Sequence, residues 1–406
     1  MTPAELRAAS RLGGHAFAGA VSRIEQVHQA IAGRAFGPVR HAGAPARLIH
    51  DHVSRSVYLA IRSAGSAAGA MFGEVLSPLS AGGQPVSSTP KGNLALSALN
   101  AIAGDRLRPD VDPLAIRMAV RAGGYDVDPA ARPLTAAFPL ATPRLAVFVH
   151  GLAETENSWD PRSDGSTSYG ERLRAELGYS PVYIRYSTGR HVSDNGQDLA
   201  GLLDRLTAAW PAQVEEVLLI GHSMGGLVIR SACHYGQQSS MAWARQVRHV
   251  FYLGSPHLGA PLARAAGFAG WALGQVAETK PFVTLVNGSS AGIKDLRYGY
   301  LLPDDWAGCD QDRCLRDHRH DAPLLAGANH YAISGTITDD PGSPVGAVVG
   351  DLLVPPTSAH GRRGRRQRIP FAADSGRRLG GIHHFSLLNH PAVWVAMRGF
   401  LGHTAD

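Results

Sequence analysis

The sequence predicts an α/β fold in which a mostly parallel sheet is covered by helices on both faces. Two observations support this prediction. After about residue 139, short apolar runs typical of buried parallel strands alternate with amphipathic helical patterns. One run, 217–220, leads directly into a glycine-rich turn that is followed by another helical pattern.

Composition narrows the class of protein. Of the 406 residues, 44% are hydrophobic, as in ordinary globular chains. The net charge of +6 leaves peripheral contact with an anionic membrane open. No base-stacking basic face or nucleic-acid motif accompanies it, so no nucleic-acid partner is expected. Because no signal peptide or membrane-spanning segment is predicted, we expect a cytoplasmic protein. Nothing in the sequence predicts the oligomeric state.

Residues 1–138 are predicted to form a helical extension. Apolar residues recur at three- and four-residue spacing over residues 4–10, 17–31, 50–76 and 94–102. Residues 82–91 are rich in glycine, serine and proline and are predicted to form a loop. Since this region contains no catalytic motif, we expect it to pack on the main domain.

Residues 139–406 contain the predicted sheet. Apolar runs predict strands over residues 145–149, 182–186, 217–220, 250–253 and 331–337. Amphipathic patterns predict helices over residues 198–210, 227–235 and 385–401. Ser193 or Asp194 is expected to cap the first of these helices. The stretch from about 262 to 326 contains no strand pattern, which favours a lid over a site.

The strongest motif is Gly-His-Ser-Met-Gly at residues 221–225. A serine hydroxyl becomes a nucleophile when it is exposed on a sharp turn and given a base. Such a turn needs small residues two positions before and two after the serine, and Gly221 and Gly225 supply them. A strand is predicted before the motif and a helix after it. This context predicts Ser223 as the nucleophile of an α/β-hydrolase fold.

A second motif, His150-Gly151-Leu152, follows the first apolar run. Acyl transfer passes through an oxyanion that two backbone N–H groups stabilise. The N–H groups of Leu152 and Met224 are predicted to form this oxyanion hole. His150 is expected to be a structural loop residue. Glu154 and Glu156 nearby are expected to be solvated.

The acid of the triad should follow the serine in the chain. Asp351 is preferred because it follows a glycine beyond the last predicted strand and precedes an apolar Leu-Val-Pro that would fix its loop. Asp339 and Asp340 are its rivals, since they end the strand run more directly.

The base should be a histidine beyond the acid. His384 is preferred over His383 because it lies on a glycine-containing loop just before a predicted helix. His390 and His360 are weaker candidates, and His390 is expected to lie inside the helix. His384 would accept the proton of Ser223, and Asp351 would orient the imidazole.

These residues predict hydrolysis of a carboxylic ester through an acyl-enzyme on Ser223. The substrate would be a small-molecule or lipid ester with an apolar acyl chain, and no metal or organic cofactor is required. A polyester is a further substrate of the same class. An acyltransferase with the same triad is an alternative. A non-catalytic binding protein would need a broken triad or a blocked pocket.

Five segments together resemble bacterial serine esterases of the lipase and esterase branch, and most closely the PGAP1-like (GPI inositol-deacylase-like) proteins. They are VFVHGL, LLIGHSMGGLVIRSA, YLGSPHLGAPLA, GDLLVP and HHFSLLNHPAVW, and they span about residues 145–401. The resemblance implies the roles assigned to Ser223, Asp351 and His384. It also implies that His257 is structural or lines a pocket. The chain lacks the transmembrane segments of the eukaryotic deacylases, and residues 1–140 lie outside the resemblance.

Two further features have no place in the predicted reaction. Cys233 is expected to be a buried apolar residue, whereas Cys309 and Cys314 could close a small disulfide loop in an oxidising compartment. Five arginines between residues 362 and 368 form a basic run. We interpret this run either as a solvated loop or as a landing patch for anionic headgroups.

Overall fold

The computed structural model describes residues 1–15, 83–160, 167–260, 290–308, 318–363 and 366–402, together with scattered positions between 18 and 74. Contacts divide the chain into two compact units. One contains Met1–Ser88 and Val111–Leu114, and the other contains Thr89–Asp110 and Ala115–Asp406. The second unit holds the whole sheet and every candidate site residue.

In the first unit, residues 3–15 form a helix. The Glu5 carboxylate is buried and accepts hydrogen bonds from the N–H of Thr2 at 2.7 Å and of Val86 at 3.0 Å. The predicted helix over 4–10 is therefore confirmed. The helices predicted over 17–31 and 50–76 lie largely outside the described residues.

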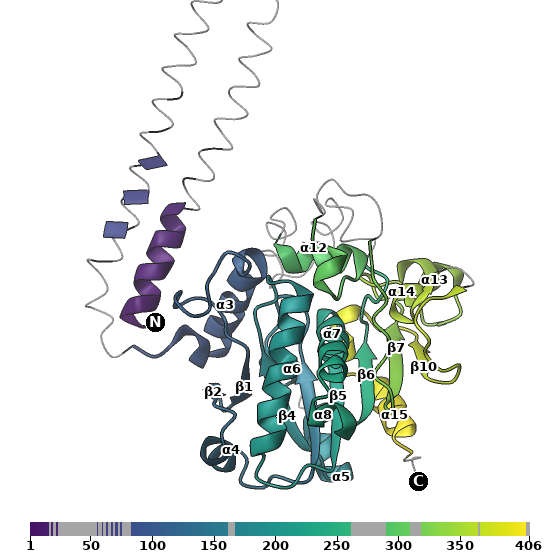
Figure 1. The fold of residues 1–406 in the computed structure, drawn as a ribbon. Coiled ribbons are helices and arrows are strands. Elements are labelled where there is room, and N and C mark those ends of the chain that lie inside the picture. The colour runs from purple at the N-terminus through teal and green to yellow at the C-terminus, as the bar shows by residue number, and fades with distance from the viewer. Residues whose placement is uncertain are drawn as a thin grey trace, which may run out of the picture. The chain divides into compact units, whose positions relative to one another are not determined.

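The second unit is built on an eight-stranded sheet (Figure 1) with the order β10-β7-β6-β5-β3-β4-β1-β2. From β10 to β4 every neighbouring pair is parallel, whereas β1 is antiparallel to both β4 and β2. The strands are β1 (Ala119–Ala122), β2 (Tyr125–Val127), β3 (Arg144–Val149), β4 (Ser180–Arg185), β5 (Glu216–His222), β6 (Val247–Leu253), β7 (Asn329–Gly335) and β10 (Gly376–Leu379).

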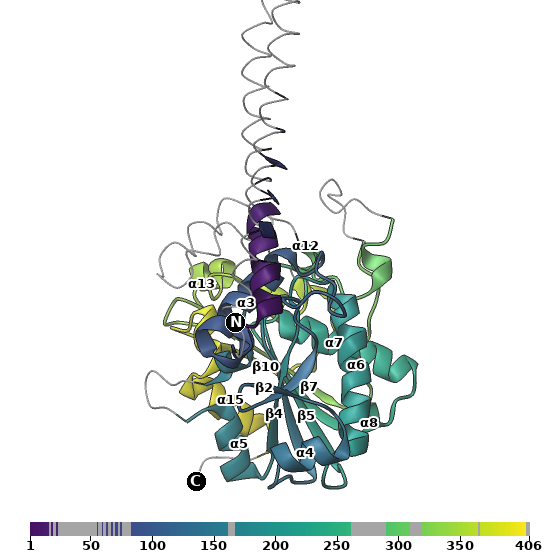
Figure 2. The ribbon, with the colours of Figure 1, turned by 90° about the vertical axis from the view of Figure 1, so that its left-hand side faces the viewer.

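Helices cover both faces of this sheet (Figure 2). One face is covered by α6 (Val192–Ala209), α7 (Met224–Gln238) and α8 (Ala242–Gln246), and the other by α5 (Tyr169–Leu177) and α15 (Pro391–Phe400). The smaller elements are α3 (Pro90–Ala103), α4 (Ala131–Ala137), α12 (Ala291–Tyr298), α13 (Pro344–Val349), α14 (Pro356–Ala359), the hairpin of β8 (Arg362–Arg363) and β9 (Arg366–Gln367), and the 3₁₀ helices η3 (Val86–Ser88), η4 (Glu156–Trp159), η6 (Pro303–Asp305) and η7 (His384–Leu388).

Strand β3 shows why both faces need a cover. Its side chains alternate between the faces, so Leu145, Val147 and Val149 join the core under α6 and α7. Ala146 and Phe148 join the core under α5 and α15. A strand buried on both sides is apolar throughout, which explains the continuous runs in the sequence. The predicted parallel sheet with helices on both faces is confirmed.

The five predicted strands are confirmed as β3, β4, β5, β6 and β7. The helix predicted over 198–210 begins earlier, at Val192, and the predicted cap is wrong. Neither Ser193 nor Asp194 caps it, because the Val192 N–H instead donates to the carboxylate of Asp295 on α12 at 2.8 Å. A partner about 100 residues away in the chain leaves no local pattern.

The helix predicted over 385–401 is also shorter than expected. Residues His384–Leu388 form the 3₁₀ helix η7, and α15 begins only at Pro391. Proline fits the first turn of a helix but not its interior, so it divides the apolar pattern in two. His390 is consequently the N-cap of α15, where its side chain accepts a hydrogen bond from the Ala392 N–H at 3.1 Å.

The sequence did not predict β1, β2 or β10. The first two are short and partly exposed, and β10 carries two arginines, so none shows a continuous apolar run. The division of the chain at residue 138 stays a prediction, although β1 and β2 precede it and belong to the sheet.

The lid predicted over about 262–326 is described only in part. Its described residues include α12 and η6, whereas 261–289 and 309–317 lie outside the described residues. Cys309 and Cys314 are among the latter. Cys233 is buried on α7 as expected, and burial raises the pKa of its thiol to about 12. None of the described helices is both long and apolar enough to span a bilayer.

Candidate active site

Ser223 lies on a sharp turn between β5 and α7. Its φ of 51° and ψ of −121° are unusual for a residue with a side chain. Such a conformation costs of order 1–3 kcal/mol and persists only where its surroundings hold it. Here the Ser223 N–H donates to the carbonyl of Leu253, at the end of the neighbouring strand β6, at 2.8 Å.

Glycines let the start of α7 approach the sheet closely. A Cβ on Gly225 would lie 2.1 Å from the carbonyl oxygen of Val149, which belongs to β3. A Cβ on Gly226 would lie 2.0 Å from Oγ of Ser255, just beyond β6. The strand, turn and helix around the Gly-His-Ser-Met-Gly motif thus have the geometry of the serine elbow of α/β-hydrolases.

Asp351 and His384 form a buried pair in two loops beyond β7 and β10. His384 Nδ1 lies 2.8 Å from Asp351 Oδ2, and their side chains are 3% and 0% exposed. Asp351 Oδ1 accepts hydrogen bonds from the N–H groups of Leu353 and Val354. The His384 N–H donates to the Asp351 carbonyl at 3.0 Å, so backbone and side chain both join the two loops.

Electrostatics favour a charged His384 more than an ordinary histidine. Burial lowers the pKa of its imidazole. The charge and hydrogen bond of Asp351 and the charge of Glu154 raise the pKa by more than burial lowers it, so the net pKa lies above that of an ordinary histidine. The second ring nitrogen, Nε2, remains available for another partner. This arrangement suits a base that must be stabilised when it becomes charged.

The serine turn and the Asp–His pair meet at Gly254. Gly254 follows Leu253, whose carbonyl holds the Ser223 N–H. A Cβ on Gly254 would lie 3.1 Å from Asp351 Oδ2 and 3.2 Å from Cε1 of His384. The structure therefore brings the three predicted residues to one edge of the sheet, at the carboxyl ends of its parallel strands, where ligands bind in α/β folds.

The rival residues have other surroundings. Asp339 and Asp340 are exposed. His383 is exposed as well, and its Nε2 lies 2.7 Å from Oγ of Ser386. His360 Nε2 lies 2.9 Å from Oγ of Ser334 on β7.

The loop after β3 lies against the serine. A Cβ on Gly151 would lie 3.0 Å from Cβ of Ser223, so Leu152 follows directly at the site. Met224 is the first residue of α7, where N–H groups lack a partner within the helix. No described residue accepts a hydrogen bond from the N–H of Leu152 or of Met224.

The expectation that Glu154 is solvated is wrong. Its side chain is 7% exposed, and its Oε1 lies 2.8 Å from Nδ1 of His222. Glu154 Oε2 accepts a hydrogen bond from the Gly151 N–H at 2.7 Å. Burial raises the pKa of Glu154, but His222 and the Gly151 N–H lower it to a net value below its ordinary one. An ionised carboxylate therefore holds the loop beside Ser223.

His222 continues this network toward the base. Its Nε2 lies 3.1 Å from the carbonyl oxygen of His384, and the two rings are 4.7 Å apart. The Glu154–His222 pair thus contacts both the loop after β3 and the histidine loop. In the sequence, this network is visible only as a carboxyl three residues after Gly151. The partners of that carboxyl come from distant segments, so no local pattern predicts them.

Glu156 was also expected to be solvated, and this expectation is wrong. It is buried beside Arg121 of β1, with 2.8 Å between Oε1 and Nε. His150 is fully buried and stacks on Tyr186, in agreement with a structural role. Glu156 is buried because β1 and α3, through Arg121 and Asn93, cover a loop that was expected to be exposed.

One family of known proteins matches part of this chain. Residues 183–311 match the PGAP1-like alpha/beta domain. The matched segment contains Ser223 and α7, so the resemblance predicted from the motifs is confirmed there. It covers less than half of the chain. No curated protein matches the chain.

Several solved structures are similar at low identity. Bacillus licheniformis lipase BlEst2 in mature form is 20% identical over 64% of this chain and 90% of its own, with a TM-score of 0.40. Phospholipase PlaB from Legionella pneumophila is 15% identical over 60% of this chain and 53% of its own, with a TM-score of 0.37. The metagenomic carboxyl esterase MGS0156 is 16% identical over 80% and 98%, with a TM-score of 0.35. At these low scores, the fold assignment rests on the strand order and the turn at Ser223.

Proposed function

We propose that this protein is a serine hydrolase that cleaves carboxylic esters through an acyl-enzyme on Ser223. The observation that carries the proposal is the buried 2.8 Å contact between Asp351 and His384, in loops that meet the serine turn at Gly254. A carboxylate on one imidazole nitrogen leaves the other free to accept a proton, as a general base requires.

In the proposed reaction, Ser223 Oγ attacks the ester carbonyl carbon while its proton passes to Nε2 of His384. Asp351 keeps Nδ1 protonated and stabilises the imidazolium. His384 then gives the proton to the alcohol oxygen as the carbon–oxygen bond breaks, which leaves an acyl group on Ser223. Water, deprotonated by His384, attacks this acyl group and releases the carboxylic acid and the serine.

The negative charge that forms on the carbonyl oxygen needs donors already in position. We assign the N–H groups of Leu152 and Met224 to this role, because both belong to segments beside Ser223 and no described residue accepts from them. Loss of one such donor typically costs about 100-fold or more in rate.

Glu154 acts in this proposal as a positioning residue. Its hydrogen bond to the Gly151 N–H orients the His150–Gly151 peptide, one residue before the Leu152 N–H. Its charge also raises the pKa of His384. The Glu154–His222 pair would therefore fix the loop after β3, which carries the Leu152 N–H, relative to His384.

The proposal is tested with p-nitrophenyl esters from acetate to palmitate. The wild type should cleave them, and Ser223→Ala should lose about 10⁴-fold or more in kcat. Ser239→Ala, exposed at the far end of α7, is the matched control and should retain full activity. A fluorophosphonate that labels neither Ser223 nor any other residue would instead favour a binding protein. The chain-length profile separates an esterase from a lipase.

The alternative of acyl transfer uses the same acyl-enzyme and differs only in the acceptor. An added alcohol would then appear in an ester product at a proportion far above its share of the solvent. A product that is only free acid supports hydrolysis.

A further inference from the structure

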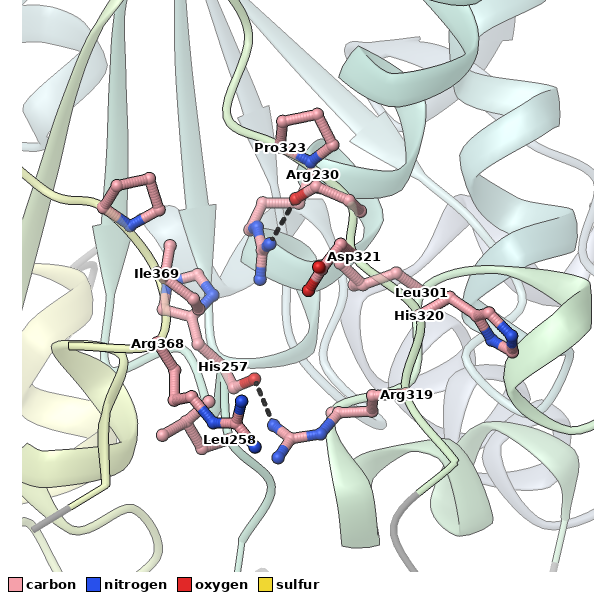
Figure 3. Close-up of a pocket in the computed structure, with 13 residues that line it drawn as sticks. Arg230, His257, Leu258, Leu301, Arg319, His320, Asp321, Pro323, Arg368 and Ile369 are labelled. Atoms are coloured by element: carbon pink, nitrogen blue, oxygen red, sulfur yellow. Dashed lines mark hydrogen bonds between the residues drawn. The ribbon is translucent and has the colours of Figure 1, made fainter. Parts of the chain in front are cut away.

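A cavity of about 610 Å³ in the second unit is lined by arginines that the proposed reaction does not use. Figure 3 shows the side chains of Arg230, Arg319 and Arg368 around one hollow. They come from α7, from the segment before Asp321 and from the residues after β9. His257 lines the same cavity, and Asp321 is the one carboxylate among the lining residues of this pocket.

Arg230 is a buried charge without a described counter-ion. Its side chain lies on α7, and the residue is only 7% exposed. Nη2 donates to the Ala322 carbonyl at 2.8 Å, but Nε has no described partner. Burial lowers the pKa of Arg230, and the charge of Arg319 lowers it further. The charge of Asp305 raises it, but no described carboxylate forms an ion pair with Arg230. Because a buried guanidinium without an ion-pair partner is costly, an anion bound in the cavity would stabilise it.

His257 is a second unsatisfied group in the same wall. It is 1% exposed, and neither ring nitrogen has a hydrogen-bond partner among the described residues. Burial and the charge of Arg230 hold the pKa of His257 well below its ordinary value, so the ring is neutral and offers one N–H donor. Both ring nitrogens are buried, so His257 adds an unsatisfied polar group beside the cavity but no exposed donor.

The remaining groups add charge at the mouth. Arg319 Nη1 lies 3.3 Å from the His257 carbonyl, which holds the guanidinium at the cavity. Arg368 is exposed and belongs to the basic run noted in the sequence. Among the described lining residues, three guanidinium groups stand against one carboxylate, so arginine charge predominates there.

We infer that this cavity binds a phosphate group. Guanidinium groups match the geometry of phosphate oxygens and bind them through paired hydrogen bonds. Phosphate offers more acceptor oxygens than a carboxylate, in agreement with three arginine side chains around one cavity. The sequence motif Ser-Pro-His-Leu-Gly-Ala-Pro and the basic run thereby contribute to one site.

The location connects this cavity with the proposed function. Arg230 lies about two helical turns beyond Ser223 on α7, or about 10 Å along the helix axis. None of the residues that line the cavity belongs to the proposed triad. The phosphate could therefore be part of the ester substrate itself or a free phosphate. Only the substrate case rests on the proposed function.

The binding test needs no catalysis. Inorganic phosphate is titrated into the full chain by calorimetry at constant ionic strength, with chloride as the reference salt. We expect one site on the wild type and on Arg205→Gln, whose arginine is exposed on α6 and does not line the cavity. Arg368→Gln should weaken binding about tenfold, the value of one charge-assisted hydrogen bond. Arg230→Gln should abolish it.

Arg368 is exposed, so Arg368→Gln should fold even if Arg230→Gln does not. In that case the phosphate affinity of Arg368→Gln tests the inference. Absence of phosphate binding to the wild type would overturn the inference, as would equal affinities of Arg205→Gln and Arg368→Gln.

A second arm separates the two sources of phosphate, using 1-acylglycerol 3-phosphate and the matching 1-acylglycerol. If the cavity holds the substrate phosphate, Arg368→Gln lowers kcat/KM about tenfold for the phosphorylated ester only, and inorganic phosphate competes with it. If the cavity holds free phosphate, both esters respond to Arg368→Gln equally. Phosphate binding that depends on Arg368 in a protein that cleaves no ester would sustain this inference and refute the proposed function.

Discussion

The contact between Asp351 and His384 links ester hydrolysis to pH. Only a neutral imidazole can accept the Ser223 proton, so kcat/KM should fall as the pH drops through the raised pKa of His384. Asp351→Asn removes the charge that raises this pKa. We expect the acid limb of the pH–rate profile to move to lower pH and the plateau to fall by about 10⁴-fold.

The measurement is the pH profile of kcat/KM on a short-chain p-nitrophenyl ester, from mildly acidic to mildly basic pH. An Asp340→Asn variant is the control, since Asp340 is exposed. A change of profile in Asp340→Asn and none in Asp351→Asn would exchange the roles of the two residues.

Glu154 gives a prediction for a residue that does not react. Glu154→Gln keeps the volume of the side chain but removes the charge next to the Gly151 N–H and His222. We expect kcat to fall about tenfold, the value of one charge-assisted hydrogen bond. The acid limb should also move to lower pH, because the charge of Glu154 helps to raise the pKa of His384.

Glu216→Gln is a matched control at the start of β5, the strand that ends at His222; there Glu216 pairs with Arg144 at 3.1 Å. It removes an identical charge far from the serine. If both variants leave the acid limb where it is in the wild type, Glu154 is only a structural residue.

Individual site residues could be predicted from the sequence where their role also requires particular residues next to them in the chain. Ser223 stood out because a sharp turn needs glycines at fixed spacing. Asp351 and His384 followed from chain order and from the loops that carry them. Glu154 did not, because its partners His222 and Ser97 lie on other elements and a lone carboxyl in a loop is usually solvated.

Helix α7 illustrates how tightly an element must fit. Gly225→Ala would place a methyl group 2.1 Å from the Val149 carbonyl and 2.6 Å from that of His150. Both are backbone atoms, which cannot rotate away. We expect the free energy of unfolding to fall by about 3 kcal/mol, at the upper end for overpacking, as measured by urea denaturation.

Gly399→Ala in α15 is the counterpart, since a Cβ there would meet no atom within 4 Å. This change should raise the free energy of unfolding by about 0.5–1 kcal/mol, because alanine favours helix. A Gly225→Ala protein as stable as the wild type would refute the close approach of α7 to β3.

Elements were predictable to the extent that their causes are local. Strands buried on both faces are marked by unbroken apolar runs, and all five runs proved to be strands. The start of α6 was missed because Asp295, distant in the chain, holds its first N–H. The split between η7 and α15 was missed because the apolar pattern continues across Pro391.

For the whole molecule, the main omission was the edge formed by β1 and β2 with α3. These residues cover β4 and the loop after β3 through polar contacts. Arg121 pairs with Glu156 at 2.8 Å, and Asp126 with Arg185 at 2.8 Å. Polar contacts between distant segments give no periodic pattern, so this region was assigned to a separate extension.

The boundary of the second unit can be tested by truncation. A chain that begins at Gly83 keeps α3, β1 and β2, and we expect it to unfold cooperatively and to retain ester hydrolysis. A chain that begins at Pro139 lacks the partners of Glu156 and Arg185 and uncovers β4, because its neighbouring strand β1 is lost. It also loses the buried side chains of Val120 and Leu134 from the core. Each such side chain contributes about 1.5–3 kcal/mol when fully buried, so their loss is a large part of the stability of a domain.

We therefore expect the chain from Pro139 to be aggregated or molten, with exposed apolar surface and no cooperative thermal transition. Circular dichroism in the near ultraviolet and size exclusion distinguish these outcomes. If the chain from Pro139 instead folds and cleaves esters as well as the chain from Gly83, the catalytic unit begins at residue 139. The edge of β1, β2 and α3 would then be an accessory to the sheet. If only the longer chain folds, α3 and the antiparallel pair of β1 and β2 are part of the catalytic unit, because they neutralise the charges beside the loop that follows β3.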